Sequence, residues 1–420
     1  MSSTSGKRRR VLVLTQVYHP EPNFITAEVA ESLAADSDVT VVTGHPNYPW
    51  GRFYPDTRFL AIEKSSMNGV TVWRVPFYPD HSLSAFRRAI SCLSFAVSAS
   101  IVAPFVAGKP DTVWVYHGPF TTGLASLFFK FVYRSRIVFT CADRWPESFG
   151  ATGMVKSRIV MSIASLYNRT LNRAADLIVC ATHGTLRHFR EEGIPSENLT
   201  MIPVWVAQTE ELGASLPEER PESLNIVYTG NLGPAQSLHT VILAAAILQN
   251  EGSRVRFDIY GTGASEEKLR ALAEQERATN VTFHGLVTVA EAFGASARAL
   301  AQIIILQPSP LFSGTIPSKL FSAFAAASPI LYGLQGESAE LTAASGAGIP
   351  FASGDPQSLV DAVKTLLAIT PANRQEMRLR LRRYFAENFD PAKLKARYVN
   401  ILRAPSPTLA ARLESDFDGA

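Results

Sequence analysis

The sequence is poor in cysteine. Its three cysteines, Cys92, Cys141 and Cys180, are widely separated in a chain of 420 residues. Neither a disulfide framework nor the paired spacing of a zinc site can be built from them, so we expect a reducing, cytoplasmic compartment. Charged residues make up only 18% and hydrophobic residues 46%, which is typical of a globular protein. A chain of this length suits two domains of about 200 residues each.

The sequence also lacks a well-formed export signal. Arg8–Arg10 precede an apolar run of about seven residues, and no small-residue cleavage site follows. We interpret this region as a first strand behind a loose basic tail. A longer uncharged run from Ala89 to Ala107 has the length of a membrane span, but it contains four serines and a proline. We expect a buried or interfacial helix there, with Arg87 and Arg88 suited to docking on a membrane surface.

The sequence contains short motifs that resemble metal or dinucleotide sites, but their positions or spacing do not fit such sites. Asp36-Ser37-Asp38 has the D-x-D spacing of some metal-dependent transferases, but it precedes a strand and is interpreted as a turn. Asp416-Phe417-Asp418 lies in the expected C-terminal tail. We therefore expect no metal and no bound cofactor. Gly261-Thr262-Gly263 is not the dinucleotide fingerprint, because Glu266 stands at the third glycine position.

The two halves of the chain differ in charge. Residues 1–205 carry 21 Lys and Arg against 15 Asp and Glu, a net +6, whereas the remainder carries 19 against 22, a net −3. A basic N-terminal half suits anionic lipid or a phosphorylated acceptor, and ordinary surface variation is the alternative. Nothing in the composition indicates a nucleic-acid partner.

Short apolar runs alternate with helical patterns through the first half. Ile25, Val29 and Leu33 recur at helical spacing between the first two runs. Because a strand–helix–strand crossover joins parallel strands, we expect a parallel sheet. The expected strands are residues 11–16, 39–43, 70–75, 112–116, 137–140, 177–180 and 199–202.

The pattern stops and then restarts. Residues 206–223 are polar, acidic and proline-containing, as linkers often are. Strands are expected again at residues 225–228, 256–260, 281–283, 302–306 and 330–332. The fold class predicted is α/β, with two Rossmann-like, doubly wound parallel sheets. The expected divisions are a first domain over 1–205, a linker over 206–223, a second domain over 224–385, a C-terminal helix over 386–403 that packs back on the first domain, and a tail over 404–420.

Candidate ligand-binding residues follow the strands of the second half. Open parallel sheets bind ligands at the carboxyl ends of their strands. The loop Gly230–Gly233 follows one strand and Gly261–Gly263 follows the next, and glycines let backbone N–H groups approach a phosphate. Thr315–Lys319 opens a helix, whose free N–H groups and partial positive charge attract anions. A tight turn or a simple capped helix with a solvated lysine would explain each motif without a ligand.

A polar segment follows a strand of the first half. Asp143-Arg144-Trp145-Pro146-Glu147-Ser148 brings two carboxylates, an arginine and an indole to a strand's carboxyl end, which suits a polar site with an apolar wall. The alternative is a capped helix start with proline in its first turn. His117 also follows a strand, and either a ligand contact or a structural role would account for it.

Several motifs, taken in order, resemble one family. They are YHPEPNF at 18–24, TGHPNYPWG at 43–51, DRWPES at 143–148, TGNLGPAQ at 229–236, NVTFHG at 280–285, IPSKLF at 316–321 and GE at 336–337. Together they resemble glycosyltransferase family 4, in the WbuB-like branch that builds bacterial surface polysaccharides, over roughly residues 10–400. The resemblance implies the GT-B fold, with two Rossmann-like domains facing a cleft. It also implies retaining, metal-independent transfer from a nucleotide diphosphate sugar, UDP- or GDP-linked, to a lipid-linked acceptor at the inner face of the cell membrane.

Roles for individual residues follow from the motifs together with the resemblance. Lys319 would stabilise the departing diphosphate, while Asp143 and Glu147 would orient or deprotonate the acceptor hydroxyl. The donor would be bound by Gly230, Asn231, Gly233, Gln236, Gly261, Gly263, His284, Pro317, Ser318, Ser322 and Glu337. The acceptor would be bound by Asn23, Asn47, Tyr48, His117 and Trp145.

The sequence departs from the family at several of these positions. Ser322 stands where many members place a glutamate for the ribose hydroxyls, and Pro234, Gln236 and Ser237 stand where the wider family places cations. Ala142 replaces a common histidine. A catalytically degenerate scaffold of a polysaccharide assembly complex, or a sugar-nucleotide epimerase of the same fold, therefore remain the alternative functions.

Overall fold

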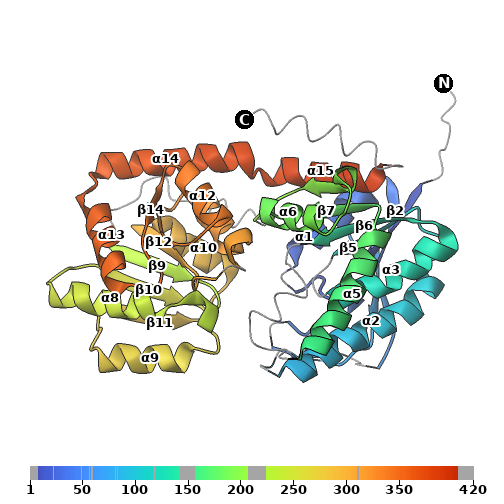
Figure 1. Cartoon of the computed structure of the whole chain (residues 1–420), viewed down its shortest axis with the longest axis horizontal. Helices are drawn as coiled ribbons and strands as arrows, with labels where there is room; N and C mark the ends of the chain where they lie inside the picture. Colours follow the sequence, from blue (N-terminus) through green and yellow to red (C-terminus); the bar gives the residue numbers. More distant parts are fainter. Residues whose placement is uncertain are drawn as a thin grey trace. The chain divides into compact units, whose positions relative to one another are not determined.

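The computed structural model divides into two compact units. One unit runs to Pro203 and also takes in the chain from Ala392 onward, and the other is Val204–Pro391 (Figure 1). Because Ala392 and the residues after it return to the first unit, the second unit ends a few residues later than the sequence suggested. The structure describes residues 8–404 apart from Pro22, Pro49, Asp56, Arg58, Phe59, His81, Leu83, 117–119, 142–156, 207–223, Pro310 and Leu311.

Unit 1 is built on an eight-stranded sheet in the order β3-β4-β2-β1-β5-β6-β7-β8. All neighbouring strands are parallel except β3 and β4, which form an antiparallel hairpin. Asn68 and Gly69 make its two-residue turn with positive φ angles of 49° and 82°, as the Asn-Gly pair favours. The strands are β1 (Arg9–Leu14), β2 (Ser37–Gly44), β3 (Glu63–Met67), β4 (Val70–Val75), β5 (Thr112–Tyr116), β6 (Arg136–Cys141), β7 (Leu177–Cys180) and β8 (Leu199–Met201).

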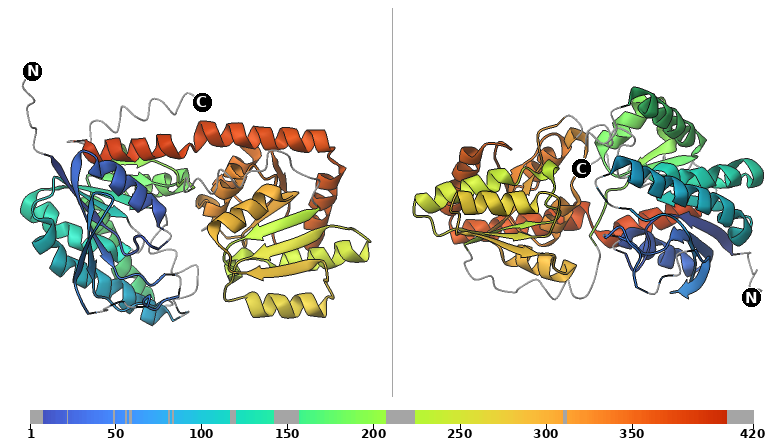
Figure 2. Two further views of the ribbon diagram at one scale, coloured as in Figure 1. Left: turned by 180° about the vertical axis from the view of Figure 1, so that it is seen from behind. Right: turned by 90° about the horizontal axis from the view of Figure 1, so that it is seen from below.

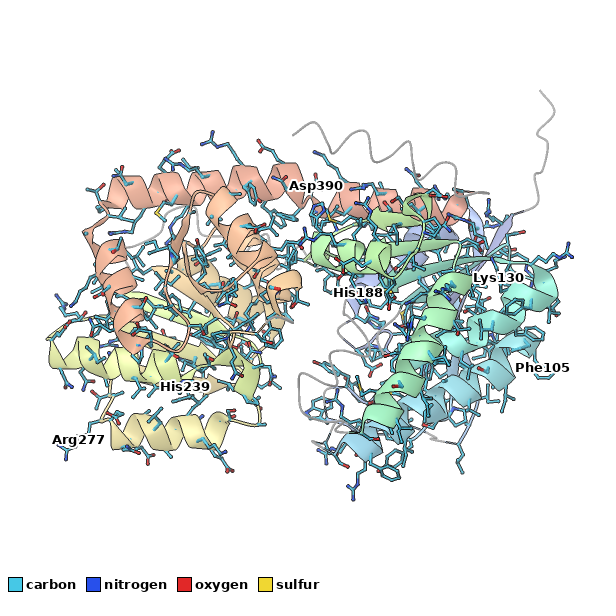
Figure 3. All side chains as sticks on the ribbon, viewed as in Figure 1. Phe105, Lys130, His188, His239, Arg277 and Asp390 are labelled. Carbon is cyan, nitrogen blue, oxygen red and sulfur yellow. The ribbon has the colours of Figure 1, made fainter. Side chains whose placement is uncertain are left out.

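Helices cover both faces of this sheet (Figure 2). Phe95, Phe129 and Phe139 are fully buried and come from two helical segments and one strand, so the core lies between helices and sheet. Lys130, which is labelled in Figure 3, lies on η2 and pairs with Asp176, just before β7, at 2.6 Å. The helical segments are α1 (Phe24–Ala34), α2 (Ala85–Ala107), η1 (Phe120–Gly123), α3 (Leu124–Phe128), η2 (Phe129–Tyr133), α5 (Arg158–Ala174), α6 (His183–Glu191), η3 (Ser196–Asn198) and α15 (Pro391–Arg403).

Unit 2 has a six-stranded sheet in the order β11-β10-β9-β12-β13-β14, with every neighbouring pair parallel. Its strands are β9 (Asn225–Thr229), β10 (Arg256–Tyr260), β11 (Val281–Gly285), β12 (Ala301–Ile305), β13 (Ile330–Gly333) and β14 (Gly348–Pro350). Its helices are η4 (Pro234–Gln236), α8 (His239–Asn250), α9 (Glu266–Gln275), α10 (Val289–Arg298), η5 (Phe312–Gly314), α11 (Ser318–Ala325), α12 (Glu337–Ala344), α13 (Pro356–Ala368) and α14 (Pro371–Asn388).

The twelve strands expected from the sequence are confirmed, and two further strands were missed. β3 is the polar edge segment Glu63–Met67, which carries no apolar run of strand length. β14 is only Gly348–Pro350, and glycine and proline normally argue against a strand. Both lie at sheet edges, where burial does not enforce an apolar pattern.

Arg8, Arg9 and Arg10 make structural contacts, so the interpretation of these three residues as part of a loose tail is wrong; residues 1–7 lie outside the described residues. Arg9 donates to the carbonyl oxygens of Arg403 and Ala404 at the end of α15. Arg136 donates to the carbonyl of Ile401 at 2.5 Å and also to that of Ala404. Carbonyls in the last turn of a helix lack the usual N–H partner four residues on, and their partial negative charge favours a cation. The last helix is therefore held on unit 1 by arginines from β1 and β6.

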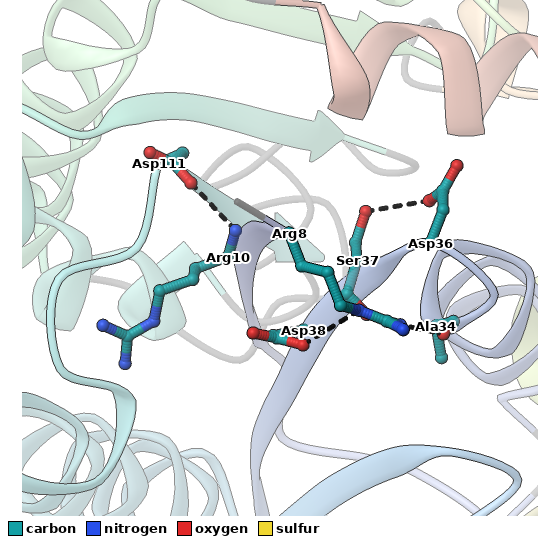
Figure 4. A network of polar contacts seen from close by, with 7 residues as sticks. All are labelled: Arg8, Arg10, Ala34, Asp36, Ser37, Asp38 and Asp111. Carbon is teal, nitrogen blue, oxygen red and sulfur yellow. Dashed lines mark hydrogen bonds and ion pairs between the residues drawn. The ribbon is translucent and has the colours of Figure 1, made fainter. Parts of the chain in front are cut away.

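The D-x-D segment lies at the amino end of β2 and belongs to the same polar network (Figure 4). Asp38 pairs with Arg8 at 3.1 Å, and Asp36 pairs with Arg403 at 2.8 Å. Arg8 also donates to the carbonyls of Ala34 and Ser37. These two carboxylates stabilise the turn into β2 and lie opposite the sheet edge at which ligands bind.

Candidate functional site

The sheet of unit 2 reverses its direction of winding between β9 and β12. From β9 the chain moves outward to β10 and β11, and it then returns to the other side of β9 for β12 and β13. Ligands of open α/β sheets bind at such a switch point, outside the carboxyl ends of the strands. The loop after β9 begins with Gly230, and the chain after β12 leads to the start of α11 at Ser318. The candidate site is formed by these two segments.

The two glycine loops pack directly on one another. Gly230 donates its backbone N–H to the carbonyl of Tyr260 at 2.9 Å, and Leu232 donates to Thr262 at 3.0 Å. A Cβ on Gly261 would lie 1.9 Å from the carbonyl oxygen of Gly230, so only glycine fits there. Two N–H groups of the first loop are thus used in packing rather than pointing at a ligand. These glycines bring two backbones together, a role that the sequence did not distinguish from phosphate binding.

Lys319 lies beneath the first glycine loop. Its ammonium donates to the hydroxyl of Tyr228 at 2.6 Å and to Oε1 of Gln236 at 2.9 Å. It also lies 4.3 Å from the centre of the Tyr228 ring and beside Gly230, whose ideal Cβ position is 3.3 Å from the Lys319 Nζ. Tyr228 in turn donates to the carbonyl of Asn231 at 2.7 Å. The lysine predicted from the Pro-Ser-Lys motif is therefore placed at the switch point.

The groups that hold the Lys319 ammonium are neutral. A tyrosine hydroxyl, an amide oxygen and a ring face can accept hydrogen bonds or attract a cation, but none of them carries a negative charge. Burial lowers the pKa of Lys319 to about 7, because desolvation penalises the charged form. Lys319 as a whole residue is intermediate in exposure. An anion that reached this amine would supply the charge that these three groups do not.

The start of α11 has no side-chain cap. Pro317 is the N-cap residue, so Ser318 is the first helical residue and its hydroxyl does not cap the helix as the sequence suggested. Ser318 is exposed and Ser322 is partly buried one turn later. The first N–H groups of a helix have no partner within it and carry partial positive charge. Lys319 is the second residue of this helix, so its side chain and these N–H groups belong to the same helix start, at the carboxyl end of the sheet.

Glu337 is buried at the first position of α12. Gly336, which precedes it, has a φ of 60° and lies so close to the Ser313 carbonyl that a Cβ would be 2.1 Å from that oxygen. The helix start is thus packed tightly against η5. The structure brings Glu337 to the same edge of the sheet as Lys319, because both follow the carboxyl ends of neighbouring strands β12 and β13.

His284 is not a free loop residue. It is the fourth residue of β11, its Nε2 lies 2.9 Å from Oδ1 of Asp258, and its ring stacks on Tyr260 at 4.2 Å. Asp258 also accepts from the Asn225 side chain at 2.8 Å. The strand expected over 281–283 extends through His284, and the pairing of β10 with β11 places its ring.

In unit 1 a buried carboxylate joins the loops that follow β1 and β2. Oε1 of Glu21 accepts hydrogen bonds from the backbone N–H groups of Asn47 at 2.9 Å and Tyr48 at 2.8 Å. The Asn47 amide also donates to this oxygen, and Oε2 accepts from the backbone of Tyr18. The pKa of Glu21 is raised overall, because the effect of burial exceeds the opposite effect of the hydrogen bonds from Asn47, Tyr48 and Tyr18. Sequence reasoning missed Glu21, whose only signal was a lone acid between two prolines.

The structure separates the roles of the residues expected to bind the acceptor. Asn47 is 1% exposed and serves the loop, whereas Tyr48 is 41% exposed. Asn23 uses its amide to bond the carbonyl of Val17 at 2.9 Å, so it also shapes the loop after β1. Of these three, Tyr48 presents most surface to a ligand. His117, Asp143, Trp145 and Glu147 lie outside the described residues.

A metal centre does not emerge from the described part of the chain. Among those residues, no three His, Cys, Asp or Glu side chains gather as a set that could hold an ion. Lys319 and the start of α11 are the positively charged features that the structure places at the switch point.

Comparison with known families identifies both halves of the chain. Residues 22–205 match the Glycosyl transferase 4-like domain, and residues 223–368 match the Glycosyl transferases group 1 family. The chain is 28% identical over 343 residues to the putative colanic acid biosynthesis glycosyl transferase WcaI of Escherichia coli K12. That match covers 75% of this chain and 81% of WcaI.

Solved structures share the two-domain fold at low sequence identity. Sucrose-phosphate synthase from Thermosynechococcus elongatus superposes with a TM-score of 0.70 at 13% identity, covering 94% of this chain and 98% of that one. HepE from Anabaena, solved in complex with UDP, gives 0.66 at 13% identity, with 94% and 99% covered. The predicted GT-B fold of two Rossmann-like domains is confirmed.

Proposed function

Since the chain belongs to the GT4-type glycosyltransferases, we propose that it transfers a sugar from a nucleotide diphosphate sugar to a lipid-linked saccharide. The transfer retains anomeric configuration, needs no metal and serves surface polysaccharide synthesis. Likeness to WcaI, a putative colanic acid glycosyl transferase, supports this pathway. The resemblance of the ordered motifs to the WbuB-like branch supports the lipid-linked acceptor and a position at the inner face of the cell membrane.

Lys319 is the observation that carries the proposal. A lysine held by neutral partners at a switch point is costly to the fold unless its charge serves a ligand. The diphosphate of the donor is the ligand of matching charge. Its phosphates would lie between the Lys319 ammonium and the start of α11, where backbone N–H groups add further donors.

Transfer requires the diphosphate to leave as a dianion or trianion. The bond between the anomeric carbon and the phosphate oxygen breaks, and the electron pair stays on the phosphate. Lys319 and the α11 N–H groups would stabilise this growing charge, since donors fixed before the reaction need no reorganisation. Tyr228 and Gln236 would hold the ammonium in position. In unit 1, Asp143 and Glu147 would orient the acceptor hydroxyl and take its proton, with Trp145 packing on a sugar ring.

The direct test is Lys319→Ala, measured as transfer from UDP- and GDP-linked sugars to an acceptor extracted with membrane lipid. Transfer is expected to fall by about 100-fold or more, because removal of one charged donor typically has that effect. Lys268→Ala, on the exposed surface of α9, is the matched control and should leave transfer unchanged. Transfer that persists in Lys319→Ala would remove the diphosphate assignment.

A donor screen separates the alternatives. Binding and slow hydrolysis of one nucleotide sugar would support an enzyme, whereas binding of no donor would support a degenerate scaffold. Product analysis by NMR would distinguish a transferred sugar from an epimerised donor. A native-state ligand raises the apparent melting temperature by mass action, so thermal shift serves as the first readout.

A further inference from the structure

Helix α2 is apolar on two sides. Phe95, Ala99 and Ala103 are buried in the core of unit 1. A second stripe, spaced by three or four residues, faces away from the core and consists of Phe86, Ile90, Leu93, Val97, Ile101 and Phe105. Phe105 is 85% exposed, and Figure 3 shows it at the outer surface. A surface helix normally presents polar residues on its outer side, so this stripe is suited to a partner.

Two neighbouring helical segments continue the apolar surface. On η2, Phe131 is 74% exposed, and on α5, Ile159 is 73% exposed. The α5 stripe continues at helical spacing through Ile163 and Leu166. Figures 1 and 2 show α2, α3 and α5 side by side on the same side of unit 1. We call the exposed apolar residues of α2, η2 and α5 the apolar face.

Hydrogen bonds through η1 hold these helices in one layer. The Thr121 hydroxyl donates to the carbonyl of Cys92 on α2 at 3.1 Å. The Tyr167 hydroxyl of α5 donates to the Thr121 carbonyl at 3.3 Å. The apolar face is therefore a fixed surface rather than three independent helices.

The charge of these helices has one sign. α2, α3, η2 and α5 together contain six Lys and Arg and no Asp or Glu. Arg87, Arg134, Arg169 and Arg173 are exposed, and Arg173 continues the α5 stripe seven residues after Leu166. A broad apolar surface with a cationic margin is the pattern of helices that lie in the interface of an anionic membrane.

We infer that the apolar face docks unit 1 on the anionic surface of a lipid bilayer, with α2 and α5 lying in the interface. α2 is long and apolar enough to cross a membrane by length and composition, but one third of that stretch is buried in the fold. Crossing would remove Phe95 and its neighbours from the core, whereas lying on the surface would not. A second copy of the chain is disfavoured, because a self-complementary contact would bring the same cations together.

This surface deepens the proposed function by naming how a lipid-linked acceptor would be reached. α5 follows residues 142–156 in the chain, and that segment contains Asp143, Trp145 and Glu147. α5 is the described helix that directly follows this segment in the sequence. The inference rests on the proposed function only for this acceptor, and not for lipid binding.

Sedimentation with lipid vesicles tests the docking without any donor or acceptor. The full chain is expected to bind vesicles containing about one third phosphatidylglycerol at least tenfold more tightly than vesicles of phosphatidylcholine alone. Binding should weaken as salt rises, because the cationic margin is screened. Absence of binding to both vesicles, or equal binding to both, would overturn the inference.

Substitutions locate the surface. The double variant Ile101→Ser with Phe105→Ser should reduce binding to anionic vesicles at least tenfold, because two exposed apolar side chains no longer insert. Leu286→Ser with Val289→Ser, at equally exposed positions of unit 2, is the matched control and should bind like the unchanged chain. Unaltered binding by the α2 variant would place the contact elsewhere and contradict the inference.

Three further measurements test the cationic margin and distinguish lipid docking from self-association and from loss of catalysis. Arg87→Ser with Arg173→Ser should lower binding to anionic vesicles and leave binding to neutral vesicles unchanged.

Size-exclusion chromatography with light scattering should give the same mass for the unchanged chain and the α2 variant. A dimer that the variant abolishes would assign the apolar face to a second copy of the chain instead. Transfer to a water-soluble acceptor analogue should persist in the α2 variant, so loss of docking is distinguishable from failure of the proposed reaction.

Discussion

The backbone N–H of Tyr48 donates to the buried carboxylate of Glu21 at 2.8 Å, and this contact joins the loop after β1 to the loop after β2. The loop of the Pro-Asn-Tyr-Pro motif therefore takes its shape from a residue 27 positions earlier. Tyr48 is exposed and Glu21 is buried. The buried carboxylate therefore positions a side chain that a ligand can reach.

Glu21→Ala is expected to weaken acceptor use more than donor use. It removes the acceptor of four hydrogen bonds, two of them donated by the backbone N–H groups of Asn47 and Tyr48. The loss should cost about 1–3 kcal/mol of stability for unit 1 and raise the KM for acceptor several-fold. Initial rates with each substrate varied in turn, together with thermal unfolding, measure both effects. Glu21→Gln should have an intermediate effect, because its amide oxygen can still accept a hydrogen bond. Glu197→Gln, on the exposed η3, is the control. An equal rise in the KM for donor and in the KM for acceptor would argue against a positioning role for Glu21.

Removing the Tyr228 hydroxyl should weaken donor binding without abolishing transfer. Tyr228→Phe deletes one of the two oxygen atoms that hold the Lys319 ammonium but keeps the ring beside it. A hydrogen bond to a charged group is worth about 1.5–3 kcal/mol, so the KM for the donor should rise about tenfold to 100-fold. Tyr260→Phe on the neighbouring strand is the matched control, and steady-state kinetics measure the KM for the donor in both variants. An unchanged donor KM in Tyr228→Phe would show that the hydroxyl does not position the lysine.

The stability of unit 2 should rise with pH above neutrality. The native pKa of Lys319 is about 7, well below the value near 10.4 of an unfolded lysine. Between these values the unfolded chain binds a proton that the native state has lost, so the free energy of unfolding increases with pH. Below about pH 7 both states are protonated and the contribution of Lys319 to this slope disappears. Thermal unfolding across this range, compared with Lys319→Met, should show the slope in the unchanged chain alone, and a parallel slope in both proteins would contradict the assignment.

Donor binding should be linked to proton uptake at the same lysine. A diphosphate beside Lys319 favours the ammonium, so binding above pH 7 should take up as much as about one proton, and binding at pH 6 should take up almost none. Isothermal titration calorimetry in buffers of different ionisation enthalpy measures the number directly. Lys319→Arg serves as the control, because arginine stays charged and should show no such uptake. Equal uptake in both proteins would assign the proton to another group.

The packing of the two glycine loops predicts a large effect for one small substitution. Gly261→Ala places a methyl group 1.9 Å from the Gly230 carbonyl oxygen at a φ of 126°. Urea unfolding should show a loss of more than about 2 kcal/mol, because backbone strain and a backbone clash act together. Gly252→Ala, at a φ of 79° with no atom within 4 Å, isolates the strain alone and should cost less. Equal losses would mean that the loops separate easily.

The sequence predicted the fold well where burial produces a local pattern. Strands such as β5 and β10 are short apolar runs with clear ends, and their expected bounds are those of the structure. The polar edge strand β3 and the glycine-proline strand β14 were missed because an edge position needs no apolar run. Of the candidate site, the sequence singled out the lysine at the start of α11 but neither Glu21 nor Tyr228. Glu21 lies inside the YHPEPNF motif, but its partners Asn47 and Tyr48 are in another motif, and only the packing of the two loops brings them together.

What the sequence determined by itself is what depends on near neighbours: the alternation of strands and helices, the two-domain division and the helix start that carries Lys319. The tertiary structure decided which distant residues meet. It placed Lys319 on Tyr228, 91 positions away, and Arg9 on the carbonyl of Arg403, 394 positions away. Local periodicity encodes burial, but partners across a sheet depend on strand order and register, and these arise only when the whole chain packs.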